Sequence, residues 1–433
     1  MTLAPFDTAD VVGIGFGPAN LAFAIAMREI VDGPPPRMCF LEKQSAFGWH
    51  RGMLLQDATM QVSFLKDLVT MRNPNSPFSF LSYLHARGRL TEFINNRTFY
   101  PLRIEFHDYL SWAAEHFAEE VQYGCEVLEI RPVGGPDGAV DSVEVVVRSG
   151  RTLLTRRARN VVVATGSEPV MPDGVESGER VLHSSELLHR VDDIARFGPR
   201  HLVVVGAGQS AAEVVGHLHQ RFPEAQVHAV FSRYGYSVAD DSPFANRVFD
   251  PEAVDSFYHA SPDVRQKLLD YHANTNYSVV DLDLINDLYR RTYRELVTGD
   301  RRLHVHNVSR LRAAFDTGAS VRVEIESLPT GRITTIDAEA VVFATGYRPI
   351  DPSHLLGELG GMCRRDDHGR LLTTRDYRIL TEPKLRARIY LQGPTEQSHG
   401  LSSGLLSTVA VRAGEIAVSL IREQNVAATG HTL

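Results

Sequence analysis

Two glycine-rich turns, almost two hundred residues apart, most constrain how this chain can fold. The first covers Gly13–Asn20 after the apolar pair Val11–Val12, and the second covers Gly206–Ala211 after the apolar run 201–205. A helical pattern follows each turn, and strand, glycine turn and helix in succession are typical of dinucleotide-binding folds. Glycine lets the backbone approach a pyrophosphate, whose charge is met by free N–H groups at the helix start. The sequence therefore predicts an α/β fold with two Rossmann-like units that bind one nucleotide each.

Length and charge limit the class of protein. With 433 residues, 43% of them hydrophobic, the chain is long enough for two or three domains. The net charge of −8, with no long basic run, argues against nucleic acid or an anionic membrane as a partner. Residues 1–7 lack the basic and apolar regions of a signal peptide, and no apolar stretch reaches the ~20 residues that span a bilayer. We therefore expect a cytoplasmic globular protein.

The three cysteines exclude one class of two-nucleotide enzyme. Cys39, Cys125 and Cys363 are too scattered for a CxxC redox pair or a zinc cluster, so we expect core positions for them and no metal site. A disulfide reductase of this type needs two neighbouring thiols beside its flavin. Electrons from a flavin bound to this chain must therefore go to an acceptor other than a pair of thiols.

The order of the predicted elements indicates an interrupted first domain. Residues 160–166 and 341–347 each read as a buried strand that ends in Ala-Thr-Gly, on either side of the second glycine turn. We expect a discontinuous domain of residues 1–166 and 340–433, and a second domain of residues 167–339. The second domain includes a mainly helical substrate subdomain at about 235–300, with helices over 252–271 and 281–297.

Other segments of the first domain have clear local patterns. We predict a helix from the first turn to about Ile30, a strand at 38–41, and two antiparallel strands at 126–130 and 142–148. Glu42 ends the strand at 38–41, where an acid can accept hydrogen bonds from a ribose 2′-OH. Residues 44–106 show little periodicity for so long a segment, and we interpret them as active-site architecture.

Six motifs, taken in order, resemble one family over nearly the whole chain. They are residues 11–21, 60–67, 241–246, 274–278, 344–347 and 399–402. With them the chain resembles the microbial N-hydroxylating flavin monooxygenases of siderophore biosynthesis. It is most similar to the L-ornithine N(5)-monooxygenases, which are related to the L-lysine N(6)-monooxygenases.

The resemblance implies FAD in the first domain and NADPH in the second. In this family hydride reduces the flavin, oxygen adds at its C4a position, and the resulting hydroperoxide transfers one oxygen atom to a substrate amine. The amine must be uncharged, because an ammonium has no lone pair with which to attack. The implied partners are L-ornithine and molecular oxygen, and the implied assembly is a homo-oligomer, either a tetramer or a dimer.

The resemblance also assigns cofactor residues. The FAD set is Gly13, Gly15, Gly17, Pro18, Asn20, Glu42, Trp49, His50, Gln61 and Leu401. The NADPH set is Gly206, Gly208, Gln209, Ser210, Arg233, Asn276 and Tyr277. Arg233 follows the strand at 227–231, where an arginine can meet the 2′-phosphate of NADPH. Core packing is an open alternative for Trp49, and a hydrogen-bonded histidine without catalytic importance is the alternative for His50.

The substrate set implied by the resemblance is Lys66, Asn246, Asn276, Ser402 and Ser403. Lys66 would hold the amino-acid carboxylate by a charge-assisted hydrogen bond, and Asn246 would add uncharged donors. Asn276 is the candidate for a residue at the reacting centre, and no general base stands out. Ser403-Gly404 departs from the Asp-Thr pair of several relatives, which leaves the contacting serine open.

Other functions stay open at this point. The same chemistry on L-lysine or a diamine is the first alternative, although Lys66 favours a substrate that has a carboxylate. Oxygenation of sulfur or a ketone is the second, but Gly178 and His183 do not have the spacing of its signature. A catalytically silent NADPH-sensing flavoprotein is the third, because a fold alone does not establish function.

Overall fold

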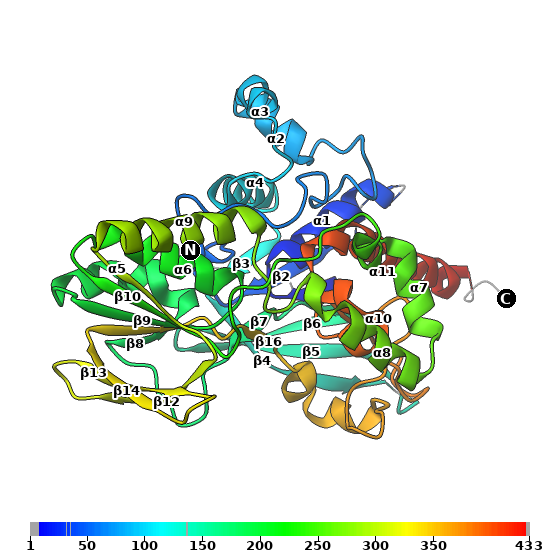
Figure 1. The fold of residues 1–433 in the computed structure, drawn as a ribbon. Coiled ribbons are helices and arrows are strands. Elements are labelled where there is room, and N and C mark those ends of the chain that lie inside the picture. The colour runs from blue at the N-terminus through cyan, green and yellow to red at the C-terminus, as the bar shows by residue number, and fades with distance from the viewer. Residues whose placement is uncertain (1–7, 32, 35, 136, 430–433) are drawn as a thin grey trace.

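Two large sheets, each with helices beside it, form the main body of the computed structural model (Figure 1). It describes residues 8–31, 33–34, 36–135 and 137–429, with side chains of 423–429 outside the description. The predictions for the N-terminal residues 1–7 therefore lie outside the described residues. Among the described residues, no helix has both the length and the apolar content to cross a bilayer.

The first sheet has seven strands in the order β3-β2-β1-β6-β5-β4, and β17 pairs with β6. The pairs β1–β2, β2–β3, β1–β6 and β6–β17 are parallel, whereas β4–β5 and β5–β6 are antiparallel, as predicted for the first of these two pairs. The strands are β1 (Thr8–Ile14), β2 (Met38–Glu42), β3 (Val121–Tyr123), β4 (Cys125–Gly134), β5 (Val140–Ser149), β6 (Thr152–Val163) and β17 (Arg388–Leu391).

Helices α1 and α11 contact each other beside this sheet, and their apolar faces enter one core together with α4. The predicted irregular segment 44–106 contains two short α-helices that its sequence pattern did not reveal. All three cysteines are buried and free, as predicted. The helices are α1 (Pro18–Ile30), α2 (Phe80–Ala86), α3 (Leu90–Asn96), α4 (Arg103–Glu115), α10 (Glu396–His399) and α11 (Val409–Thr429).

The second sheet is parallel, with five strands in the order β11-β10-β9-β15-β8. A three-stranded antiparallel sheet, β12-β13-β14, shares a core with one of its faces, and helix α6 packs on the other. The strands are β8 (Val181–His183), β9 (His201–Val205), β10 (Gln226–Val230), β11 (Leu303–His306), β12 (Ser309–Asp316), β13 (Val321–Ser327), β14 (Ile333–Ala338) and β15 (Ala340–Phe343). The helices here are α5 (Leu187–Arg196) and α6 (Gln209–Arg221).

The chain passes between the two large sheets twice, and the two passages lie side by side. Strand β7 (Ser167–Pro169) follows β6, and strand β16 (Tyr347–Pro349) follows β15. They pair antiparallel as a separate two-stranded sheet. Each passage begins at a glycine with positive φ, Gly166 at 74° and Gly346 at 87°.

The segment 235–300 is helical, as predicted, but its helices have different neighbours. The stretch 252–271 is helical, as predicted, but it forms two helices: α7 (Pro251–His259) ends before Ser261, and Pro262 starts α8 (Pro262–His272). Helix α7 contacts α10, whereas α9 (Leu282–Thr298) packs on α6 (Figure 1).

Short 3-10 helices connect these elements. They are η1 (Arg51–Met53), η2 (Ser184–Glu186), η3 (Ala245–Phe249), η4 (Ala273–Thr275), η5 (Pro352–Leu355), η6 (Gly357–Met362), η7 (Leu401–Gly404) and η8 (Leu406–Thr408).

Candidate active site

The first glycine turn joins β1 to the start of α1, and its glycines have separate reasons to be glycine. A Cβ on Gly13 would lie 2.2 Å from the ring of Phe40. Gly15 has φ 81°, and its Cβ would lie 2.4 Å from the carbonyl oxygen of Ala164. A Cβ on Gly17 would meet no protein atom within 4 Å. The third glycine thus leaves open space in front of the α1 N-terminus, where Pro18 begins the helix and free N–H groups can receive an anion.

Asn20 and Glu42 hold this turn from inside the protein. The buried Asn20 amide donates to the Gly15 carbonyl at 2.7 Å, and its oxygen accepts from Gln392 at 3.0 Å. Glu42 ends β2, as predicted, and its two carboxylate oxygens accept from the backbone N–H groups of Phe16 at 2.7 Å and Gln44 at 2.8 Å. Both side chains therefore fix the shape of the turn.

The second glycine turn repeats this construction between β9 and α6. Gly206 has φ 144°, and its Cβ would lie 2.4 Å from the carbonyl oxygen of Ala344. Gly208 is the N-cap of α6, and its Cβ would lie 3.5 Å from the Cα of Ser278. Ser278 therefore lies against this turn, and Ser210 is partly exposed in the first turn of α6.

The side chain of Gln209, predicted to contact NADPH, is hydrogen-bonded within the protein. Its amide nitrogen donates to Glu213 at 3.0 Å and to Asp281 at 3.4 Å, and its oxygen accepts from the Asp281 backbone N–H at 2.9 Å. The Glu213 carboxylate in turn accepts hydrogen bonds from two guanidinium nitrogens of Arg103 in α4. This network ties α6 to α4 and α9, and it leaves the backbone N–H of Gln209 for a ligand.

Arg233, Asn276 and Tyr277 lie around the same turn. The Arg233 guanidinium donates to the Ser278 carbonyl at 2.9 Å through one nitrogen. Asn276 ends η4, and the Tyr277 hydroxyl donates to the Glu396 carboxylate in α10. Burial, together with this carboxylate, raises the pKa of Tyr277. Tyr277 thus connects the second glycine turn to the segment that leads into η7.

The predicted substrate residues come from three segments that meet. The Lys66 ammonium lies 5.6 Å from the ring centroid of Phe249, a residue of η3. Asn246 belongs to the same 3-10 helix and donates to the Asp241 carbonyl at 2.6 Å. Helix η3 packs against η7, which contains Leu401, Ser402 and Ser403, all buried.

The Lys66 side chain is half-buried, and its ammonium makes no hydrogen bond or ion pair with the described residues. Burial lowers the pKa of Lys66, and Asp250 opposes this effect. A partly desolvated ammonium that has no hydrogen-bond partner in the protein can bind a carboxylate by donating to its oxygens.

Trp49, His50 and Gln61, three predicted FAD residues, have different surroundings. Trp49 is partly buried against the first core, with its ring 6.2 Å from that of Phe106. His50 adopts a left-handed backbone with φ 50°, and its ring lies 5.9 Å from the ring of Tyr347. Gln61 is exposed and makes no hydrogen bond within the described part of the chain.

Four buried hydroxyl and amide oxygens in the segments after β6, β17 and α10 have no hydrogen-bond partner among the described residues. Their sequence carries little signal except for the predicted Ser403. The atoms are Thr165 Oγ1, Gln392 Oε1, Thr395 Oγ1 and Ser403 Oγ. Because buried polar groups are almost always hydrogen-bonded, a bound ligand or water would supply the missing partners of these atoms.

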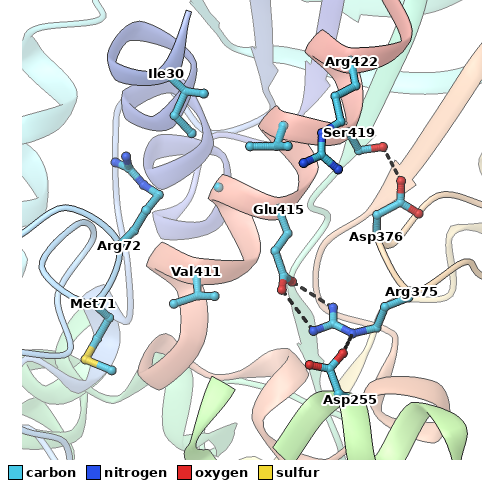
Figure 2. A pocket seen from close by; sticks show the side chains of 12 residues that line it. Ile30, Met71, Arg72, Asp255, Arg375, Asp376, Val411, Glu415, Ser419 and Arg422 are labelled. Carbon is cyan, nitrogen blue, oxygen red and sulfur yellow. Dashed lines mark hydrogen bonds and ion pairs between the residues drawn. The ribbon is translucent and has the colours of Figure 1, made fainter. Parts of the chain in front are cut away.

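A pocket beside α11 is separate from this site (Figure 2). Its wall includes Arg375, which pairs with Asp255 at 2.6 Å and with both oxygens of Glu415 at 2.9 and 3.0 Å. None of the predicted site residues lines it. The charge of Arg375 is already matched by these two carboxylates, and the pocket has no part in the candidate active site.

Comparison with known proteins decides the family. Residues 7–349 match the family described as L-lysine 6-monooxygenase/L-ornithine 5-monooxygenase. The chain belongs to this family.

Relatives of this lysine/ornithine monooxygenase are similar over nearly their whole length. A solved ornithine N-hydroxylase from Kutzneria sp. 744, named as a complex of reduced FAD, NADP+ and L-ornithine, has 49% identity and a TM-score of 0.92, with 96% of this chain and 100% of that chain covered. The L-ornithine N(5)-monooxygenase of Burkholderia cepacia is 42% identical, over 90% of this chain and 89% of its own. The solved L-lysine 6-monooxygenase of Pseudomonas syringae has 34% identity and a TM-score of 0.83, with 96% and 99% covered.

Proposed function

We propose that this monooxygenase hydroxylates the side-chain amine of L-ornithine, using FAD, NADPH and molecular oxygen, and releases N(5)-hydroxy-L-ornithine. The observation that carries the proposal is the unpaired, half-buried Lys66 beside η3, which itself packs on η7. A carboxylate bound to Lys66 would fix one end of an amino acid and leave its far amine free to reach the reacting centre. A hydroxylated ornithine of this kind is a precursor for hydroxamate siderophores or related natural products.

The residues at the first turn fit FAD. The open face of Gly17 admits a pyrophosphate at the α1 N-terminus, and the free lone pairs of Glu42 suit ribose hydroxyls. The unpartnered oxygens of Thr165, Gln392 and Thr395 suit the polar edge of a flavin. When bound, FAD supplies the oxygen-activating chemistry at its C4a position. We assign residues 1–166 and 340–433 to this cofactor.

The second turn, within residues 167–339, fits NADPH. The N-terminus of α6 offers backbone N–H groups, including that of Gln209, to the pyrophosphate. Arg233 uses one guanidinium nitrogen on Ser278 and keeps its remaining donors for the 2′-phosphate. Asn276 and Tyr277 then lie on the side that faces α10 and η7, where the nicotinamide must reach the flavin.

The substrate side of the site orients the amine and excludes water. Asn246 adds donors to the carboxylate end, and the buried hydroxyl of Ser403, which lacks a partner, can accept from the amine end. Burial of the amine lowers its pKa and favours the uncharged form that can accept oxygen. No proton-accepting side chain is required by this arrangement.

A product assay tests the proposal directly. FAD-loaded protein is incubated with NADPH and, separately, L-ornithine, L-lysine, putrescine and cadaverine, and hydroxylamine products are quantified by mass spectrometry. We expect hydroxylated product mainly from L-ornithine. Preferential product from L-lysine would move the assignment to the lysine branch, and product only from the diamines would refute the role of Lys66. NADPH oxidation without product from any amine would support a different flavoprotein function.

Two substitutions at Lys66 test the carboxylate contact. Lys66→Ala should raise the KM for L-ornithine by a factor of about 10 to 100, because a charge-assisted hydrogen bond contributes about 1.5–3 kcal/mol. FAD content and the rate of flavin reduction by NADPH should stay near those of the wild type. Lys66→Arg keeps the charge and should raise the KM for L-ornithine by a smaller factor. Loss of bound FAD in Lys66→Ala would contradict the assignment.

A further inference from the structure

Helix α9 has two apolar faces, and only one of them is covered. Leu284, Ile285 and Leu288 pack into the core between α6 and the second sheet. The opposite face is apolar too, with Tyr289, Tyr293 and Leu296 spaced by four and three residues. The exposed fractions on this face are 56% for Leu282, 75% for Tyr289, 62% for Tyr293, 61% for Leu296 and 68% for Val297. We call these five residues the outer α9 stripe.

The charges along α9 change sign from one end to the other. Asp283 and Asp287 lie in the N-terminal half, and Arg290 and Arg294 lie in the C-terminal half. Within the helix, only Arg291 pairs with Asp287, at 2.6 Å. Arg290 and Arg294 are exposed and make no ion pair with any residue that the structure describes. Two basic side chains therefore stand beside the outer α9 stripe without partners.

We propose that the outer α9 stripe binds the same stripe of a second copy of this chain, with the two helices antiparallel across a two-fold axis. The antiparallel direction brings the acidic half of one helix opposite the basic half of the other. A parallel arrangement would place like charges side by side. A two-fold interface uses one self-complementary surface on both subunits, and this change of sign along one helix provides that property.

The exposed area suits the centre of an interface. A tyrosine presents roughly 150–250 Å² when fully exposed, so Tyr289 and Tyr293 together expose about 270 Å². The three aliphatic members bring the stripe to about 550 Å², against the ~800 Å² that each partner buries in a standard interface. Arg290, Arg294 and Asp283 would contribute the remaining area as a polar rim around an aromatic centre.

Charge reversal on α9 tests the pairing in the FAD-loaded protein by sedimentation velocity. One variant, Arg290→Glu/Arg294→Glu, makes α9 acidic, and another, Asp283→Lys/Asp287→Lys, makes it basic. The wild type should sediment with two or four times the chain mass, and each variant alone should have half of the wild-type mass. Arg332→Glu, at an exposed position in the turn before β14, is the control and should keep the wild-type mass.

Mixing the two variants gives the decisive result. An equimolar mixture should recover the wild-type mass, because an acidic α9 then meets a basic one, and this recovery also shows that both variants are folded. A monomeric wild type would overturn the proposal, as would an unchanged mass in both variants. A mixture that stays at half mass would overturn the antiparallel pairing.

Discussion

The buried ion pair between Arg103 and Glu213 should stabilise the joint between the two large sheets. Arg103, at the start of α4, donates to the two carboxylate oxygens of Glu213 in α6 at 2.8 and 2.7 Å. It also donates to the carbonyl oxygens of Met53 at 3.0 Å and Thr59 at 3.3 Å. The two side chains are only 11% and 5% exposed, so water cannot replace a missing partner.

Arg103→Leu leaves a buried carboxylate without its counter-charge. Breaking a buried pair from one side costs about 3–5 kcal/mol, and a carbonyl that loses its donor adds roughly 1 kcal/mol. We therefore expect the free energy of unfolding to fall by about 3–6 kcal/mol. The double variant Arg103→Leu/Glu213→Leu removes both charges and should recover most of this loss, because apolar replacement of a buried pair is often close to neutral.

Urea unfolding of the FAD-loaded protein, followed by far-UV circular dichroism and flavin fluorescence, measures these differences. The two signals report whether the units unfold together, which decides whether a single free energy applies. Arg148→Leu is the matched control, since Arg148 pairs with Glu126 at the surface with exposures of 52% and 46% and should lose less than about 1 kcal/mol. Equal losses in Arg103→Leu and Arg148→Leu would refute the reasoning.

Two further predictions concern the first glycine turn and the second sheet. Gly15→Ala should destabilise the protein and abolish FAD retention, because the new Cβ would lie 2.4 Å from the Ala164 carbonyl oxygen. Gly17→Ala should weaken FAD binding alone, since a Cβ at this position meets no protein atom within 4 Å. Thermal unfolding and flavin absorbance separate the two, and an equal loss of stability would contradict the account. Burial, with nearby histidines, lowers the pKa of His228 from 6.5 to about 3, so the unfolded chain binds more protons and wild-type stability falls as pH drops below 6.5. His228→Gln should flatten this dependence in urea titrations at different pH, and an unchanged slope would count against it.

Helices could be predicted where the residues that start and end them are local in the sequence. The prediction of a helix over 281–297 was confirmed within a residue, since Asp281 caps the first N–H groups and Gly299 ends the helix in a left-handed conformation with φ 76°. The helical prediction over 252–271 was confirmed too, but it did not reveal that Pro262 divides this stretch into two helices. A proline disfavours the helical conformation at the residue before it, here Ser261, and this preference outweighed the helical pattern on both sides.

The contacts that build the site could not be predicted in the same way. Arg103 and Glu213 are 110 positions apart, and neither belongs to a motif. Gln209 follows the glycine turn, yet its amide binds Asp281, which is 72 positions away. Single polar residues whose partners are distant in sequence leave no periodicity to read. The roles assigned to Lys66 and Asn246 came from the resemblance and stay predictions.

The two passages between the sheets determine which relative movements the chain allows. Because β7 and β16 are hydrogen-bonded to each other, neither passage can swing alone. Gly166 and Gly346, where the two passages begin, each lie two residues after Ala164 and Ala344, whose carbonyl oxygens contact the two glycine turns. Any rotation of one large sheet relative to the other about the β7–β16 pair would therefore move both glycine turns at once. The two proposed cofactor sites would then shift together.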